Sequence, residues 1–202
     1  MIKAVIFDIG GVLIRTEDHS SRRQWEQQLG LAERESETIV FNSEMGQKAQ
    51  SGVVTDAELW AWVGQRLGLN GAELEAFRTS FWAGDELDTG LVDFIRALRP
   101  KYQTAVISNA TDNLHQALTH KFRIADAFDL IVGSAEEKVM KPDPRIYQRT
   151  LERLGCKPPE TVFIDDFAHN IHAAQEVGMA TIHYQSGINV PAELAKLGVT
   201  PP

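Results

Sequence analysis

Five short runs of apolar residues, rich in Val and Ile, constrain the fold of this chain most strongly. They cover residues 4–7, 105–107, 130–132, 162–164 and 180–182. Each run is apolar on both faces, which is typical of strands buried in a parallel sheet rather than of half-exposed strands. Helical stretches lie between most of them. This alternation predicts an α/β fold whose core is a Rossmann-like, doubly wound parallel sheet.

Local signals mark the ends of several helices. Asp143 and Pro144 provide an N-cap followed by proline at the first helical position, and Gly155 provides a stop. A second helix is predicted over residues 168–177. A third carries the apolar residues between 91 and 98 and ends at the following proline.

Residues 16–88 have a different character and show no clear strand. Thr55 with Glu58, and Asn70 with Glu73, have the spacing of capping boxes, and each pair opens a helical pattern. We therefore predict a helical cap domain at 16–88, inserted into an α/β core domain formed by 1–15 and 89–202. All four tryptophans fall inside this insert, where helix packing is favoured over a pocket or a dimer contact. The last residues, 198–202, are expected to form a frayed tail.

The composition excludes several classes of function. The 202 residues carry a formal net charge of −8, which argues against a protein that grips nucleic acid and leaves room for a small anionic substrate. No apolar run approaches the length of a membrane span. The single cysteine, Cys156, allows no intrachain disulfide. We expect a soluble cytoplasmic protein without membrane or nucleic-acid partners, and the sequence leaves monomer and homodimer open.

Polar side chains follow the predicted strands at the points where these strands end. Asp8 follows the first run, Ser108 and Asn109 follow the second, and the adjacent acids Asp165 and Asp166 follow the fourth. A loop after the third run supplies Lys141. Ligands of open α/β sheets bind outside the carboxyl ends of the strands, so these side chains are expected to share one site.

The residue types at these strand ends suit phosphoryl transfer. Mg²⁺ prefers carboxylate and carbonyl oxygens, and Asp8 and Asp166 supply two carboxylates. A carboxylate can also attack phosphorus and form an aspartyl-phosphate. Ser108 and nearby backbone N–H groups are suited to hold the transferring group, and Lys141 is suited to stabilise its charge.

Four ordered segments resemble the motifs of the haloacid dehalogenase-like hydrolase superfamily. They are residues 5–13, 106–109, 141–147 and 162–178, and the insert resembles the small helical cap of that family. The resemblance is strongest to the branch of sugar-phosphate phosphatases, and it implies a Mg²⁺-dependent hydrolase of a small phosphorylated metabolite.

The resemblance also implies a role for each matching residue. Asp8 is the expected nucleophile and Lys141 the charge-stabilising lysine, while Ser108 and Asn109 bind the phosphoryl group. Asp8, Asp166 and the backbone carbonyl of Gly10 are the expected Mg²⁺ ligands. Asp165 is expected behind them, where it pairs with Lys141 or with metal-bound water.

One position departs from the family pattern. Phosphatases of this superfamily usually carry a second aspartate two residues after the nucleophile, which donates and accepts protons, and this chain has Gly10 there. The candidate substitutes for this acid are solvent and four side chains: Glu17, Asp18, His19 and Glu44. Two alternatives stay open: a 2-haloacid dehalogenase, which attacks carbon without Mg²⁺, and a weakly catalytic binding or regulatory protein.

Overall fold

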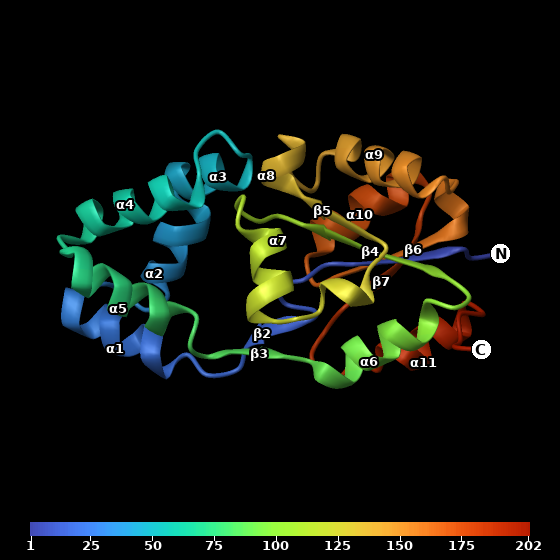
Figure 1. The fold of residues 1–202 in the computed structure, drawn as a ribbon, viewed down its shortest axis with the longest axis horizontal. Helices are drawn as coiled ribbons and strands as arrows, with labels where there is room; N and C mark the ends of the chain where they lie inside the picture. Colours follow the sequence, from blue (N-terminus) through green and yellow to red (C-terminus); the bar gives the residue numbers. More distant parts are fainter.

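A five-stranded parallel sheet forms the centre of the computed structural model, which describes residues 1–202 (Figure 1). Its strands are β1 (Ala4–Phe7), β4 (Gln103–Ser108), β5 (Leu130–Gly133), β6 (Thr161–Asp165) and β7 (Ala180–His183). They lie in the order β5-β4-β1-β6-β7, and every neighbouring pair is parallel. All five predicted strands are therefore present, and the predicted α/β class is confirmed.

Helices cover both faces of this sheet (Figure 1). On one face α6 (Thr89–Leu98) and α11 (Val190–Lys196) pack with Val5 and Phe7. On the other face α9 (Pro144–Leu154) and α10 (Ala168–Val177) pack with Ala4 and Ile6. Successive side chains of a strand point to opposite faces, so the continuous apolar sequence of β1 serves two separate cores.

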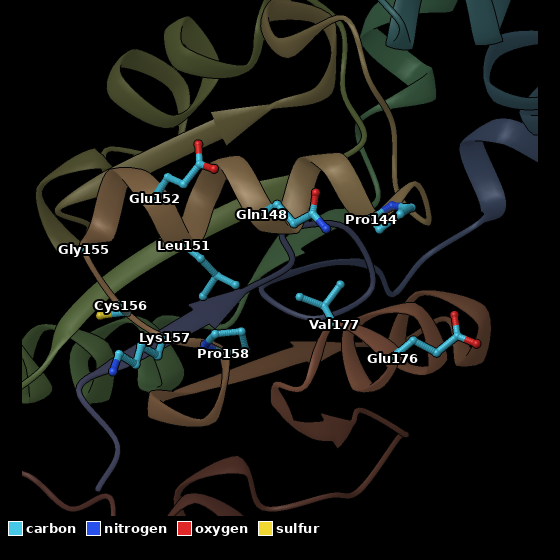
Figure 2. A pocket seen from close by; sticks show the side chains of 10 residues that line it. All are labelled: Pro144, Gln148, Leu151, Glu152, Gly155, Cys156, Lys157, Pro158, Glu176 and Val177. Atoms are coloured by element: carbon cyan, nitrogen blue, oxygen red, sulfur yellow. The ribbon is translucent and has the colours of Figure 1, made fainter.

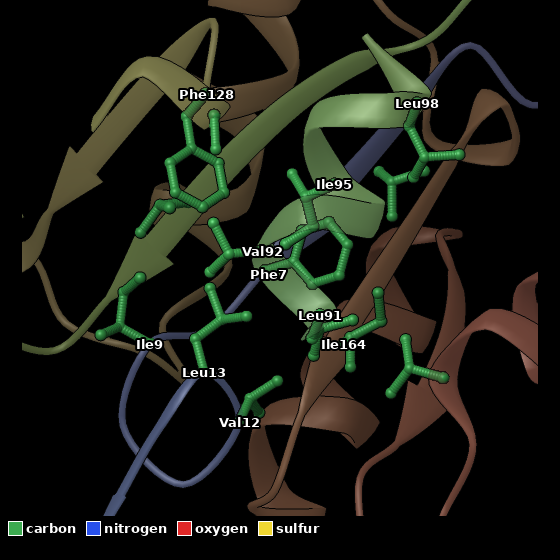
Figure 3. Packing of buried hydrophobic residues seen from close by; sticks show 14 of the residues in the cluster. Phe7, Ile9, Val12, Leu13, Leu91, Val92, Ile95, Leu98, Phe128 and Ile164 are labelled. Carbon is green, nitrogen blue, oxygen red and sulfur yellow. The ribbon is translucent and has the colours of Figure 1, made fainter. Parts of the chain in front are cut away.

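Helix α6 illustrates how the core is built (Figure 3). Its apolar face consists of Leu91, Val92, Ile95 and Leu98, all buried, and it lies against Phe7 of the central strand. Burying a side chain of this size contributes roughly 1.5–3 kcal/mol each. This packing holds β1 and its carboxyl end in a fixed position.

The predicted helix ends agree with the structure. The Asp143 carboxylate accepts from the backbone N–H of Arg145 at 2.9 Å and caps α9, and Gly155 ends the helix in the left-handed conformation. Helix α10 covers the predicted residues 168–177 and α6 ends at Leu98. These ends were predictable because capping depends on residues that are close in sequence.

The segment between the first and second strands of the central sheet is mainly helical. It contains α1 (Ser20–Leu29), α2 (Glu35–Glu37), η1 (Thr38–Asn42), α3 (Glu44–Gln50), α4 (Asp56–Leu67) and α5 (Gly71–Phe81). Both predicted capping boxes are present, at the starts of α4 and α5. These helices share an apolar cluster of their own, in which Trp60 is buried against Phe77 and Phe81. The other three tryptophans pack against the same cluster, so the structure agrees with the prediction that they serve helix packing.

Two expectations about irregular segments were wrong. The insert is not free of strands, because β2 (Ile14–Thr16) and β3 (Asp85–Leu87) pair as an antiparallel ribbon at its two ends. Each strand has three residues with one apolar side chain, Ile14 or Leu87, which is too short for a periodic pattern. The terminus is not frayed either, since Val199 is fully buried beside α11 and the Tyr102 hydroxyl donates to the Gly198 carbonyl at 3.1 Å.

The remaining short elements connect the sheet and its helices. They are α7 (Leu114–Gln116), η2 (Ala117–Lys121), η3 (Ala125–Ala127), α8 (Ser134–Glu137) and η4 (Pro158–Glu160). None of the helices combines the length and the apolar character that a membrane span requires.

The buried terminus gives a first prediction. Val199→Ala removes two methyl groups from a filled core and is expected to lower the free energy of unfolding by about 2 kcal/mol. Urea denaturation measures this loss. Val53→Ala is the matched control, because Val53 is 69% exposed and its truncation should change stability by less than about 0.5 kcal/mol. Equal effects at both positions would show that the terminus is not part of the core.

Candidate functional site

The carboxyl ends of three adjacent strands bring the predicted site residues together. Asp8 directly follows β1, Ser108 ends β4 and Asp165 ends β6, and β1 lies between the other two strands. All three side chains are buried. The parallel direction of the strands therefore places two carboxylates and a hydroxyl at one edge of the sheet.

Lys141 connects two of these carboxylates. Its ammonium lies 2.9 Å from Asp8 Oδ1 and 2.6 Å from Asp165 Oδ2, and only 1% of its side chain is exposed. Burial lowers the pKa of the Lys141 ammonium, but the charges of Asp8 and Asp165 raise it by more, so the net pKa lies above its ordinary value. The lysine therefore stays protonated and acts as a fixed positive charge.

For the pKa of the Asp8 carboxyl, the effect of burial outweighs the effect of the neighbouring positive charge. Burial raises the pKa of this carboxyl to about 7, although the neighbouring Lys141 lowers it. The backbone N–H of Ile9 donates to Asp8 Oδ1 at 2.7 Å and orients the carboxylate. A further cation beside Asp8 would favour its ionised form, which is the form that attacks as a nucleophile.

The adjacent acids Asp165 and Asp166 have different surroundings. Asp165 Oδ1 accepts from the backbone N–H of Phe167 at 2.8 Å, and the amide of Asn170 donates to both Asp165 oxygens at 3.1 Å. Lys141 also donates to Asp165 Oδ2, so both carboxylate oxygens of Asp165 have hydrogen-bond partners. By contrast, Asp166 Oδ1 is buried and has no hydrogen-bond partner.

These surroundings suit a divalent cation. One oxygen from each of Asp8, Asp165 and Asp166 lies within 4.8 Å of the others. When ionised, these three carboxylates face a single ammonium, that of Lys141, so two negative charges are left without a partner. The burial of Asp166 Oδ1 without a hydrogen bond leaves it able to serve as a metal ligand. Oxygen donors of this kind are those that Mg²⁺ prefers.

Gly11 leaves room for the Asp166 carboxylate because it has no side chain. It adopts a left-handed φ of 75°, and a Cβ atom added there would overlap the Asp166 carboxylate. A side chain at this position would therefore displace the Asp166 carboxylate from its present place. The sequence signal was the Gly-Gly pair itself, which marks a close approach of the backbone to another group.

Asn109 contacts the backbone of Lys141. Its amide donates to the Lys141 carbonyl at 2.9 Å, and its oxygen accepts from the Lys141 N–H at 2.8 Å. Its amide nitrogen carries two N–H donors and this contact uses one of them, so binding of the phosphoryl group by Asn109 stays a prediction. Asn109 fixes the loop from which the Lys141 ammonium reaches Asp8.

None of the four side chains named as candidate substitutes at Gly10 is free. Glu17 pairs with Arg15 at 2.9 Å, and the Asp18 carboxylate accepts from the backbone and hydroxyl of Ser20 at 2.7 Å. His19 lies 3.3 Å from Glu37. The exposed Glu44 pairs with Lys48 at 2.6 Å. Each of these groups therefore has a partner within its own segment or in the adjoining helices.

The helical insert contacts the sheet edge beside the site. The Ser134 hydroxyl donates to the Gln50 carbonyl at 2.6 Å, and Lys138 donates to the Gly52 carbonyl. Asp56 accepts from the Thr111 hydroxyl at 3.0 Å, in the loop that directly follows Ser108 and Asn109. The insert is therefore fastened on the side opposite its β2–β3 ribbon (Figure 1). No local pattern in the sequence indicates these contacts.

A hollow on the outer surface is separate from this site. It has a volume of about 620 Å³ and lies between α9 and the end of α10 (Figure 2). Leu151, Cys156 and Val177 line it, together with charged residues such as Glu152 and Glu176. None of the residues at the strand ends borders it, so it has no part in the chemistry of the strand ends.

Comparison with known proteins gives consistent matches over most of the chain. The family model of the haloacid dehalogenase-like hydrolases matches residues 2–178. A sesquiterpene phosphatase from Aspergillus oryzae is 29% identical over 199 residues, which cover 96% of each chain. A D-ribitol-5-phosphate phosphatase from Bacteroides thetaiotaomicron is 28% identical over 204 residues, covering 96% of this chain and 97% of that protein.

A solved structure extends the comparison to the fold. A variant of a haloacid dehalogenase family enzyme from Bacteroides thetaiotaomicron, crystallised with magnesium and inorganic phosphate, superimposes with a TM-score of 0.79 at 26% identity. The match covers 96% of this chain and 99% of that chain.

The two neighbouring glycines give a matched pair of substitutions. Gly11→Ala is expected to displace Asp166 and to weaken Mg²⁺ binding by at least ~10-fold, the factor typical of disturbed metal surroundings. Gly10→Ala should leave binding within about twofold, because a Cβ there meets nothing within 4 Å. Isothermal titration with Mg²⁺ measures both. Unchanged affinity in a folded Gly11→Ala variant would remove Asp166 from the metal site.

The contact between Asn109 and Lys141 gives a further prediction. Asn109→Ala leaves the Lys141 backbone N–H and carbonyl without partners, and should lower the free energy of unfolding by about 1–3 kcal/mol. Asn113→Ala is the control, since Asn113 lies in the same loop and makes no capping hydrogen bond. Chemical denaturation of the two variants compares them, and equal stability would contradict a fixing role for Asn109.

Proposed function

The chain belongs to the haloacid dehalogenase-like hydrolase family, and on this premise we propose that it is a Mg²⁺-dependent hydrolase of small phosphate monoesters. The observation that supports this most directly is the arrangement of Asp8, Lys141 and Asp166. A nucleophilic carboxylate lies beside a fixed ammonium, and a buried carboxylate oxygen without a partner lies nearby. The phosphatases among its relatives favour a phosphorylated substrate.

Each residue has a defined part in this proposal. Asp8 attacks the phosphorus atom and forms an aspartyl-phosphate, which water then hydrolyses. Lys141 stabilises the negative charge that develops between the carboxylate and the phosphoryl oxygens. Ser108 donates its hydroxyl to a phosphoryl oxygen, and Asn109 donates its second amide N–H to the phosphoryl group while its other contacts hold Lys141.

Asp8, Asp166 and the Gly10 carbonyl are the proposed Mg²⁺ ligands, and Asp165 supports them. When bound, the cation offsets the repulsion between the substrate phosphate and the carboxylates. Asp165 keeps the Lys141 ammonium directed at Asp8, and its own orientation is fixed by Asn170 and the Phe167 N–H.

The helical insert at 16–88 is the proposed cap over this site. Its contacts through Asp56 and the Gln50 carbonyl reach the loops next to Ser108 and Lys141. A cap in this position excludes water from the reacting groups and contacts the part of the substrate beyond the phosphate. Differences between phosphatases in their substrates would then depend on cap residues.

The nucleophile and the cation are tested together. Asp8→Asn should lower phosphate release from p-nitrophenyl phosphate and a panel of sugar phosphates by a factor of about 10⁴ or more. Removing Mg²⁺ with EDTA should abolish release, and adding Mg²⁺ should restore it. Asp93→Asn, a change at a side chain that is 74% exposed, is the control and should retain activity.

Other outcomes of this assay separate the alternatives. Metal-independent release of halide from 2-haloacids, with no release of phosphate, would identify a dehalogenase instead. Binding of phosphate without turnover of any ester would identify a binding or regulatory protein. Either result would refute the proposed phosphatase activity.

A further inference from the structure

We propose that this chain is selective for phosphate esters of acidic hydroxyl groups, such as phenols, enols and hemiacetals, over esters of simple alcohols. The inference rests on the proposed phosphatase function and names its substrate class. It follows because the site offers no positioned acid that would protonate the leaving oxygen.

The first observation concerns the residue next to the nucleophile. Gly10 lies two positions beyond Asp8 and offers only backbone atoms to the site. It is exposed, and a Cβ atom added to it would meet nothing within 4 Å. The space in which a neighbouring acid would lie is therefore open, and no side chain from another element fills it.

The second observation concerns the other proton donors around the site. The Lys141 ammonium lies 2.9 Å from Asp8 Oδ1 and 2.6 Å from Asp165 Oδ2, so its N–H groups are directed at these carboxylates and not at a leaving group. The Tyr147 hydroxyl is buried and donates to the Asn170 carbonyl at 3.1 Å. Glu17, Asp18, His19 and Glu44 are engaged elsewhere, in the pairs already described. None of these six side chains lies within 4 Å of the position that a Cβ atom of residue 10 would take.

The consequence follows from the bonds that form and break. An oxygen of Asp8 forms a bond to phosphorus, and the bond between phosphorus and the leaving oxygen breaks with its electron pair on that oxygen. Without a positioned acid, the leaving group departs as an anion and takes its proton from water afterwards. Water then attacks the phosphorus of the aspartyl-phosphate, releases phosphate and regenerates the Asp8 carboxylate, with the proton passing to solvent.

A leaving group that departs as an anion must itself be acidic. A phenol, with a pKa of about 10 as in tyrosine, bears this charge far better than a simple alcohol does. A positioned acid is worth roughly 10²–10⁴-fold in rate when the leaving group needs its proton. Esters of simple alcohols should lose this factor in full, whereas esters of acidic hydroxyls should lose little of it.

The experiment measures how the rate depends on the leaving group. The wild-type protein with saturating Mg²⁺ is assayed on substituted phenyl phosphates of graded acidity and on an alkyl phosphate of similar size. We expect kcat/KM to fall steeply as the leaving group becomes less acidic, with the alkyl ester at least ~10²-fold slower than phenyl phosphate. A flat dependence in the wild-type protein would overturn the proposal.

A matched pair of variants assigns the effect to position 10. Gly10→Asp supplies an acid and should raise the rate on the alkyl phosphate by roughly 10²–10⁴-fold while flattening the dependence. Gly10→Asn has the same shape without a titratable proton, so whatever its absolute rate, that rate should still fall steeply as the leaving group becomes less acidic. If both variants behave alike, the missing acid is not the cause and the proposal fails.

Two further outcomes are distinguishable. The wild-type series decides the proposal by itself if Gly10→Asp does not fold. If no phosphate ester is hydrolysed in a manner that depends on Asp8, the proposed function fails rather than this inference.

Trapping the aspartyl-phosphate by acid quench and measuring the protein mass gives an independent readout. Without an acid or base the aspartyl-phosphate should be hydrolysed slowly, and it should therefore accumulate during turnover of phenyl phosphate.

Discussion

The ion pairs of Lys141 with Asp8 and Asp165 are the interaction on which the rest of the site depends. Removing a charge from water costs several kcal/mol, and only close partners of opposite sign offset that cost. The ammonium therefore has to meet both carboxylates, although they follow different strands and the lysine lies on a loop. Neighbouring contacts serve this requirement: Asn109 holds the Lys141 backbone, and Asn170 holds Asp165.

Most of the fold could be predicted because its signals are local. Strand β1 is recognisable from four consecutive apolar residues, and α9 from its capping Asp143 and terminating Gly155. Strands β2 and β3 could not be predicted in this way, because three residues with a single apolar side chain show no period and the pairing depends on a partner about seventy positions away. The burial of Val199 likewise depends on Tyr102 and α11, which no local pattern connects with the terminus.

The contacts of the site also divide into those that the sequence predicts and those that it does not. The strand ends that carry Asp8, Ser108 and the two adjacent acids follow from sheet topology, so the sequence was sufficient to group them. The contact of Asn109 with Lys141 spans 32 positions and depends on how two loops meet. Neighbouring glycines also look alike in sequence although their surroundings differ, because one faces open space and the other touches Asp166. Such distinctions depend on atoms from distant segments.

The antiparallel ribbon has a consequence for how such a protein can change over time. Because Ile14 pairs with Leu87, the chain leaves the sheet and returns to it at adjacent points. Anything inserted between these points, whatever its length, leaves the spacing of β1 and β4 unaltered. An exchange of the helical part would still require new partners for Ser134 and Thr111, which donate to Gln50 and Asp56 of the insert. The ribbon therefore separates changes in the length of the helical part from the spacing of the strand ends in the central sheet.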